Sequence, residues 1–353
     1  PDYYTRADAV LQRALELGAD ESEAMTAKGA LALARHQFLE ALEWGRKAMA
    51  RNPNRAASYG VIGDALVELG RYDEAVAAVQ RMADLRPDLA SYSRVAYLRE
   101  LHGDVDGAIE AMRLAVQASA PGSEARAWTQ VQLGHLYFGQ GRLAAAEASY
   151  VAALYGYVGY IPALAAMGRL HAAQGRYTEA ASLLGKAADA MPLPEYVILL
   201  GDVHAVSGRA DEAARQYALV QVIDTLQRAN GVDTDLEMAL FRADHGVDLE
   251  EALSRAREQY GRRPSIYAAD VLAWTLYQNG ACAEGLAYAR EALRLGTRDA
   301  LMHYHAGMLA LCTGDRPAAR VHLEQALAIN PSFSIRYAPE AQSALAVITD
   351  GGQ

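Results

Sequence analysis

Residues 59–87 read YGVIGDALVELGRYDEAVAAVQRMADLRP, and this stretch decides the fold. Its apolar residues recur at intervals of three and four, which places them on one face of an α-helix. Gly70 divides the stretch into two such helices, because glycine readily adopts the left-handed conformation that ends a helix. Pro87 ends the second helix, since proline disfavours helical geometry in the residue before it. The stretch therefore predicts a pair of helices joined by a tight turn.

The same pattern recurs along the chain with a period near 34 residues. Three further copies are easily read at residues 130–154, 164–192 and 303–331. Small residues mark the position where the two helices of each pair are expected to cross: Gly29, Gly63, Ala96, Gly134, Gly168, Gly201, Ala239, Ala273 and Gly307. Side chains this small let the two backbones approach closely. A period of this length predicts an array of helical repeats.

These residues resemble the tetratricopeptide repeat (TPR) family, whose 34-residue pattern combines Leu-Gly, a glycine turn, two alanines and a closing proline. The resemblance covers almost the whole chain and extends to bacterial TPR proteins. His36 and Val247 near turn glycines, Met82 at a usual Ala and Arg99 at a usual Tyr depart from the pattern. The resemblance implies an all-α, right-handed superhelical solenoid of antiparallel helix pairs with a C-terminal capping helix.

We expect a single solenoid over residues 1–349, with an unpaired helix at 3–17 and the capping helix at 336–348. A cap is expected because the last repeat of such an array has an open apolar end. One long repeat carries SAPGSE at 119–124, and another has a second helix from about Asp211 to Ala229. The full repeats are expected at residues 22–55, 56–88, 89–126, 127–160, 161–193, 194–232, 233–265, 266–299 and 300–333.

The composition favours a binding protein over an enzyme or a nucleic-acid binder. The 353 residues include 33 Lys or Arg and 43 Asp or Glu, and the net charge of −10 disfavours a phosphate-binding surface. The sequence contains no P-loop, no Gly-x-Ser-x-Gly and no His-Glu-x-x-His motif. His303 and His305 would point to different sides of a helix, which does not suit one metal ion. We expect no catalysis, no cofactor and no metal.

Cys282 and Cys312 are the only cysteines, too few for a disulfide framework. A single bridge between them is possible, and two separate free thiols are the favoured interpretation. No apolar run approaches the roughly 20 residues that a membrane helix needs. The chain begins at Pro1 rather than Met, which suggests a trimmed or processed product and leaves a cytoplasmic and an exported location both open.

The TPR resemblance implies that function is carried by the concave surface of the first helices, which binds extended peptides or partner helices. It places positions 2, 5, 9 and 12 of each repeat in this groove. The candidate groove residues are Tyr97, Trp128, His135, Phe138, Arg169, Tyr267, Asp270, Trp274, Tyr277, Tyr304, Met308 and Leu311. Aromatic residues and Arg are enriched in binding hot spots. We expect Trp274 to lie on an exposed stripe, and the alternative is that it lies in the core.

The leading hypothesis is a non-catalytic scaffold that binds a partner protein's peptide or helix. The alternative is a self-associating or exported structural adaptor that uses aromatic patches. Residues 155–162, YGYVGYIP, supply such a patch if Tyr155, Tyr157 and Tyr160 are exposed, or pack under the repeat junction if they are not. Nucleic acid and membrane insertion are not expected, and a monomer is favoured over an oligomer.

Overall fold

The computed structural model describes residues 3–18 and 20–350. Over these residues the chain is all-α, with twenty helices and no β-strand. In chain order the helices are α1 (Tyr3–Glu16), α2 (Glu21–Ala34), α3 (Phe38–Arg51), α4 (Ala56–Glu68), α5 (Tyr72–Leu85), α6 (Leu89–Leu101), α7 (Val105–Ala118), α8 (Glu124–Gly139), α9 (Leu143–Gly156), α10 (Ile161–Ala173), α11 (Tyr177–Ala190), α12 (Pro194–Val206), α13 (Ala210–Ala229), α14 (Asp235–His245), α15 (Leu249–Arg262), α16 (Ile266–Gln278), α17 (Cys282–Ala292), α18 (Ala300–Cys312), α19 (Arg316–Ile329) and α20 (Tyr337–Asp350).

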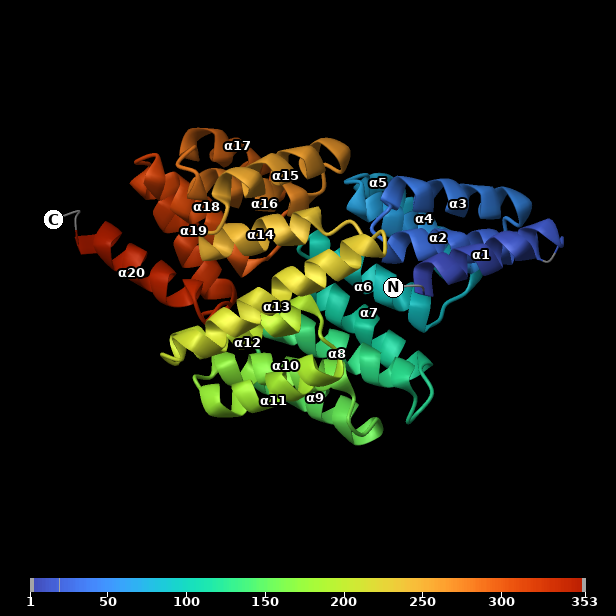
Figure 1. Ribbon diagram of the computed structural model, residues 1–353, viewed down its shortest axis with the longest axis horizontal. Helices are drawn as coiled ribbons and strands as arrows, with labels where there is room; N and C mark the ends of the chain where they lie inside the picture. The colour runs from blue at the N-terminus through green and yellow to red at the C-terminus, as the bar shows by residue number, and fades with distance from the viewer. Residues whose placement is uncertain (1–2, 19, 351–353) are drawn as a thin grey trace.

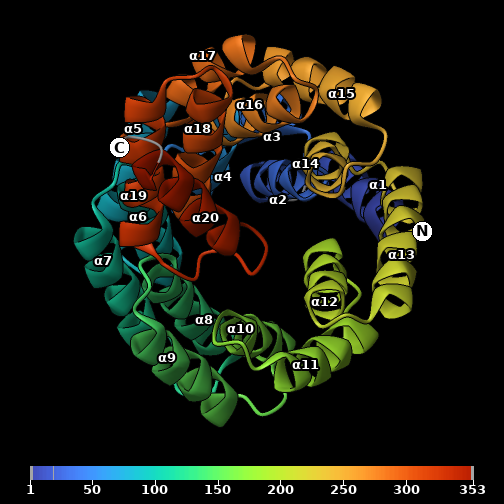
Figure 2. The same ribbon diagram turned by 90° about the vertical axis from the view of Figure 1, so that its left-hand side faces the viewer.

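The helices from α2 to α19 pack in consecutive pairs, each even-numbered helix against the odd-numbered one that follows it. The pairs form a ring in which α10, α12, α14 and α16 face inward and α11, α13, α15 and α17 face outward (Figure 2). The predicted need for small crossing residues is confirmed. A Cβ atom at Gly134 would lie 2.2 Å from the ring of Tyr150, and one at Gly168 would lie 2.7 Å from Leu184.

The solenoid completes one turn and then stacks on itself. Several hydrogen bonds join residues that lie 192 to 197 positions apart in the chain, and four of them mark the line of contact. They run between His36 and Asp233, Tyr72 and Ile266, Leu101 and Thr297, and Phe138 and Asn330. We call this line of contacts the seam. In Figure 1 the N-terminal helices α2 to α5 accordingly lie beside α14 to α16 of the C-terminal half.

Backbone groups make much of the seam. The Ile266 amide donates to the Tyr72 hydroxyl at 2.8 Å, and Asn330 Nδ2 donates to the Phe138 carbonyl at 2.8 Å. Gly70 has φ +71°, and a Cβ atom there would lie 2.3 Å from the Pro264 carbonyl oxygen. Glycine at this turn therefore both ends α4 and lets the second turn of the solenoid approach.

The interpretation of Cys282 and Cys312 as free thiols is wrong. The two residues form a disulfide, with their Cα atoms 6.1 Å apart. Cys282 begins α17 and Cys312 ends α18, and these two helices pack against each other. A separation of 30 residues is nearly one repeat, so the two positions meet across adjacent helix pairs. The bridge therefore ties the last two repeats together.

Helix α20 packs on the end of the last repeat. Its Ala341 and Ile348 are buried in one apolar cluster with Leu323 of α19. The helix lies at the end of the ring that faces the viewer in Figure 2, inside the outline of the outer helices. Among the described helices, none combines the length and the apolar character that a membrane-spanning segment requires.

Candidate functional site: the central channel

The even-numbered helices surround a hollow at the centre of the ring. Its volume is about 890 Å³, and its walls include residues of α8, α10, α12 and α14. Two smaller hollows of about 320 Å³ and 270 Å³ share wall residues with it and with each other. Trp128 and His135 line the largest and the 270 Å³ hollow, whereas Tyr97 lines both smaller ones. We call the three hollows together the central channel.

Four predicted groove residues line the channel: Tyr97, Trp128, His135 and Arg169. Tyr97 and Trp128 remain 36% and 38% exposed, so folding leaves their rings available. Phe138 is buried, and the Arg169 guanidinium lies 4.5 Å over its ring. Arg169 is exposed to the channel, yet the surrounding protein excludes enough water to lower its pKa. Burial also lowers the pKa of His135 to about 4, with help from the Arg169 charge.

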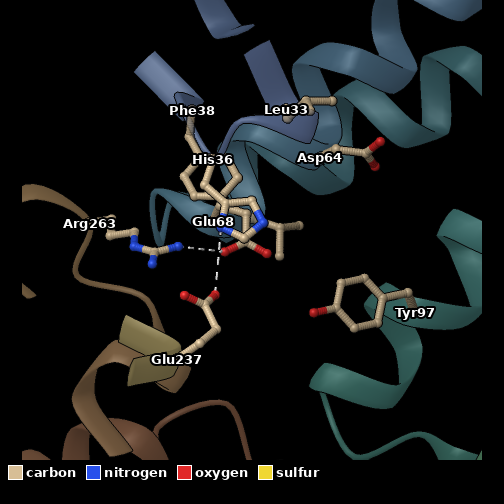
Figure 3. Close-up of a pocket in the computed structure, with 9 residues that line it drawn as sticks. Leu33, His36, Phe38, Asp64, Glu68, Tyr97, Glu237 and Arg263 are labelled. Atoms are coloured by element: carbon tan, nitrogen blue, oxygen red, sulfur yellow. Dashed lines mark hydrogen bonds and ion pairs between the residues drawn. The ribbon is translucent and has the colours of Figure 1, made fainter. Parts of the chain in front are cut away.

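The 320 Å³ hollow contains a chain of charged side chains from both sides of the seam (Figure 3). Glu68 Oε2 lies 3.5 Å from Arg263 Nη1, and Glu237 Oε1 lies 3.6 Å from His36 Nδ1. Burial raises the pKa of the Glu68 carboxyl, and the Arg263 charge opposes this shift. The Glu237 carboxylate raises it further.

The largest hollow is lined mainly by apolar and neutral residues, together with four acids, Glu195, Asp202, Glu237 and Asp244. Among the described residues that line it, Arg169 is the one Arg or Lys side chain. Burial raises the pKa values of both Glu195 and Asp244. We call these four acids the acidic wall. Arg336 already contacts Asp202 and the Asp244 carbonyl, so Glu195 and Glu237 are the acids of this wall that would favour a cationic ligand group.

Comparison with known families decides the nature of the repeat. Two family models described as tetratricopeptide repeat match the chain, one over residues 61–124 and 165–224 and the other over 127–150 and 301–325. The chain is a tetratricopeptide repeat protein. The concave surface of a TPR solenoid is here the wall of the central channel.

Solved structures similar to this TPR protein include larger assemblies. In the crystal structure of the APC/C hetero-tetramer Cut9–Hcn1, the matching chain is 16% identical with a TM-score of 0.51, and the match covers 98% of this chain but 58% of that one. The human IFIT1 dimer with PPP-AAAA is 12% identical with a TM-score of 0.53, covering 92% and 77%. A TPR protein from Parabacteroides merdae ATCC 43184 is 17% identical, with a TM-score of 0.43 and coverage of 74% and 98%. At these identities the first two show a shared fold alone. No curated protein matches the sequence.

The prediction that Trp274 lies on an exposed stripe is wrong for this TPR protein. Trp274 is 1% exposed and Tyr304 is 0% exposed. Tyr337 at the start of α20 stacks on Tyr304 at 5.0 Å and meets Trp274 edge-on at 5.5 Å. The helical spacing placed these residues on one face as predicted, but α20 and the residues before it cover that face.

The other candidates in the last two repeats are covered to different degrees. Asp270 is buried, and both its carboxylate oxygens lie 3.0 Å from His305 Nδ1. Tyr267 remains 36% exposed. The half-buried candidates that pack against the Trp274 cluster are Tyr277, Met308 and Leu311. Of the residues proposed in this region, only Tyr267 therefore keeps an exposed ring.

The acidic wall was missed although the repeat register contains it. Glu195 and Asp202 are positions 2 and 9 of the predicted repeat 194–232. Glu237 and Asp244 are positions 5 and 12 of the next repeat, 233–265. The candidate groove residues were chosen mainly for aromatic character, and these four acids were therefore not among them. Strict application of the four groove positions would have found them.

The histidines that suggested a metal lie in different surroundings. His303 Nδ1 is 3.2 Å from His322 Nδ1, whereas His305 is buried against Asp270. Within the described part of the chain, no group of three or more His, Cys, Asp or Glu side chains is placed to hold a metal ion.

Glu100 makes the seam sensitive to pH. Burial raises its pKa to about 7, and the Asp299 carboxylate across the seam adds to the shift. The pKa of Glu100 is higher in the folded protein than its value of 4.5 in the unfolded chain. Glu100 therefore contributes its full stabilisation below pH 4.5, and this contribution is lost as the pH rises through 7. We therefore expect Glu100→Gln to raise the free energy of unfolding by about 1–3 kcal/mol near pH 8 and to change it little near pH 5. Urea titration at both pH values measures this. Glu110→Gln, on the exposed side of α7, is the matched control, and an equal gain in both variants would contradict the assignment.

Proposed function

We propose that this protein is a non-catalytic scaffold that holds an extended segment of a partner protein in its central channel. TPR proteins bind protein partners, and this supports the class of function. The observation that carries the proposal is the hollow of about 890 Å³, into which Trp128 presents a ring that folding leaves 38% exposed. Aromatic side chains of this kind act as anchors in binding sites.

The seam limits the shape of the partner segment. In an open solenoid a ligand can approach the concave surface between successive turns. Here contacts such as Tyr72 to Ile266 and Phe138 to Asn330 join the turns, so the ends of the ring give access to the channel. A narrow, extended segment fits such an entrance better than a folded domain.

The acidic wall favours lysine or arginine in that segment. Glu195 and Glu237 both line the largest hollow, and the Glu237 charge adds to the effect of burial in raising the pKa of Glu195. A cation between them would relieve this repulsion, in competition with His36, whose Nδ1 lies 3.6 Å from Glu237 Oε1. The proposal therefore predicts selection for basic extended peptides.

Trp128→Ala tests the channel as the binding site. On an array of decapeptides of graded charge, we expect the natural protein to retain basic peptides and the variant to bind them at least about tenfold more weakly, since hot-spot truncations typically cost ≥ 2 kcal/mol. Trp44→Ala is the matched control, because Trp44 lies on the outward helix α3. Equal losses in the two variants, or no preference for basic peptides, would contradict the proposal.

A specific observation favours self-association as a second candidate function. Tyr155 in the last turn of α9 and Val158 after it are each 90% exposed, whereas Tyr160 is 8% exposed. The first part of the YGYVGYIP segment therefore forms an exposed patch, whereas Tyr160 lies in the core. Exposed apolar side chains that cluster can join copies of a chain. Light scattering at two concentrations tests this, and a monomer at both, unchanged by Tyr155→Ser, would exclude it.

A further inference from the structure

One of the chain's own segments lies beside the channel. Residues 332–337, which we call the C-terminal segment, run from the loop after α19 to the first residue of α20 and line a hollow of about 190 Å³. Arg169, Leu199, Asp202 and Asp244 line this hollow as well as the largest one. The C-terminal segment therefore borders a hollow that adjoins the proposed binding site.

Arg336 is the polar anchor of this segment. Its Nη1 lies 3.3 Å from Asp202 Oδ1, and its Nη2 donates to the backbone carbonyl of Asp244. Tyr337, the next residue, donates its hydroxyl to Asp244 Oδ1 at 2.7 Å. Ile335 packs against the apolar cluster of α10 to α14. The segment thus presents an arginine and flanking apolar groups to the wall, which is what a peptide ligand would do.

The groups that receive Arg336 are held in place without it. Asp202 Oδ1 accepts a hydrogen bond from the Tyr217 hydroxyl at 2.8 Å and lies 3.0 Å from His245 Nε2. Both partners belong to the repeat helices α13 and α14. Removal of the C-terminal segment would therefore leave a positioned carboxylate beside a free backbone carbonyl. Such a pair suits a guanidinium, which donates to several acceptors at once.

We propose that the C-terminal segment is an intramolecular ligand of the channel, and that an arginine-bearing segment of a partner displaces it to bind. This inference rests on the proposed function and describes how partner binding in the channel is regulated. A tethered ligand competes at an effective concentration near the millimolar range. The apparent affinity for an external segment is then lowered, because only the fraction of molecules in which the C-terminal segment is released can bind it.

The probe for this proposal is the labelled peptide NPSFSIRY, which has the sequence of residues 330–337. We expect the Arg336→Ala protein to bind this peptide at least about tenfold more tightly than the natural protein does, because the competitor is weakened. The same peptide with the Arg336→Ala change should not bind the variant. Arg320→Ala is the matched control, because Arg320 lies on α19 in an exposed pair with Glu324.

Amide hydrogen exchange supplies a readout that needs no ligand. Exchange over residues 332–340 should be faster in Arg336→Ala than in Arg320→Ala, whereas the N-terminal helices α2 to α5 should be unaffected. Arg336→Gln, which keeps more of the side-chain volume, replaces the alanine variant if circular dichroism shows lost helicity. Unchanged exchange, equal peptide affinity in variant and natural protein, or equal binding of both peptides would overturn the inference. If basic array peptides still bind through Trp128 in that case, the proposed function stands without this regulation.

Discussion

Replacement of Trp274 by alanine is expected to lower the free energy of unfolding by about 3–5 kcal/mol, the usual cost of removing a large buried aromatic side chain. Trp274 stacks on Tyr277 at 4.7 Å and on His305 at 4.2 Å. Its Nε1 also donates to Asp244 Oδ1 at 2.9 Å. The variant would lose this packing and leave a cavity between α16 and α20. Calorimetry or urea unfolding measures the loss.

Trp44→Ala provides the comparison for this variant. Trp44 is half-buried on the outward side, where its ring lies 4.5 Å from Lys47 Nζ. The same substitution there should cost much less, because solvent already reaches the side chain. Similar losses at the two tryptophans would show that Trp274 is not the centre of the C-terminal core.

Removal of the disulfide is expected to have the second largest effect. Cys282→Ser combined with Cys312→Ser should lower the free energy of unfolding by about 2–4 kcal/mol, because the unfolded chain regains the freedom of the loop that the bridge closes. The loop spans 30 residues, close to one repeat. The loss should be concentrated in α17 and α18, which hydrogen exchange can resolve.

A reducing agent gives an independent control for the same prediction. Addition of dithiothreitol should lower the stability of the natural protein to that of the double serine variant and leave the variant unchanged. A natural protein that is insensitive to the reductant, with its thiols shown to be reduced, would contradict the expected contribution of the bridge.

The helices were predictable because their signals are local. Gly70 and Pro87 set the ends of helices through the conformations of single residues, and the positive φ of Gly70 confirms the turn. The long helix expected from about Asp211 to Ala229 is α13. The groove positions that the TPR resemblance implies include Trp128 and His135 of α8, and both residues line the channel. These inferences needed nothing beyond one repeat and its neighbour.

The seam could not be predicted in the same way. Its position depends on the pitch of the superhelix, which accumulates small angles over several repeats. No motif marks Tyr72 and Ile266 as partners, because each residue is also an ordinary member of its own repeat. The burial of Trp274 was missed for a related reason, since it depends on where the segment before α20 lies. The bond between Asp244 and Trp274 belongs to the same unpredicted arrangement.

The seam has a consequence for synthesis of the chain on the ribosome. Tyr72 and Leu101 leave the ribosome long before Ile266 and Thr297, their partners 194 and 196 residues later. At ordinary elongation rates of 5–20 residues per second, this delay is about 10–40 s. During that interval the nascent first turn has its edge uncovered, and a neighbouring nascent chain could pair with it. Translation speed and chaperone supply should therefore influence the yield of this protein more than that of an open array of the same length.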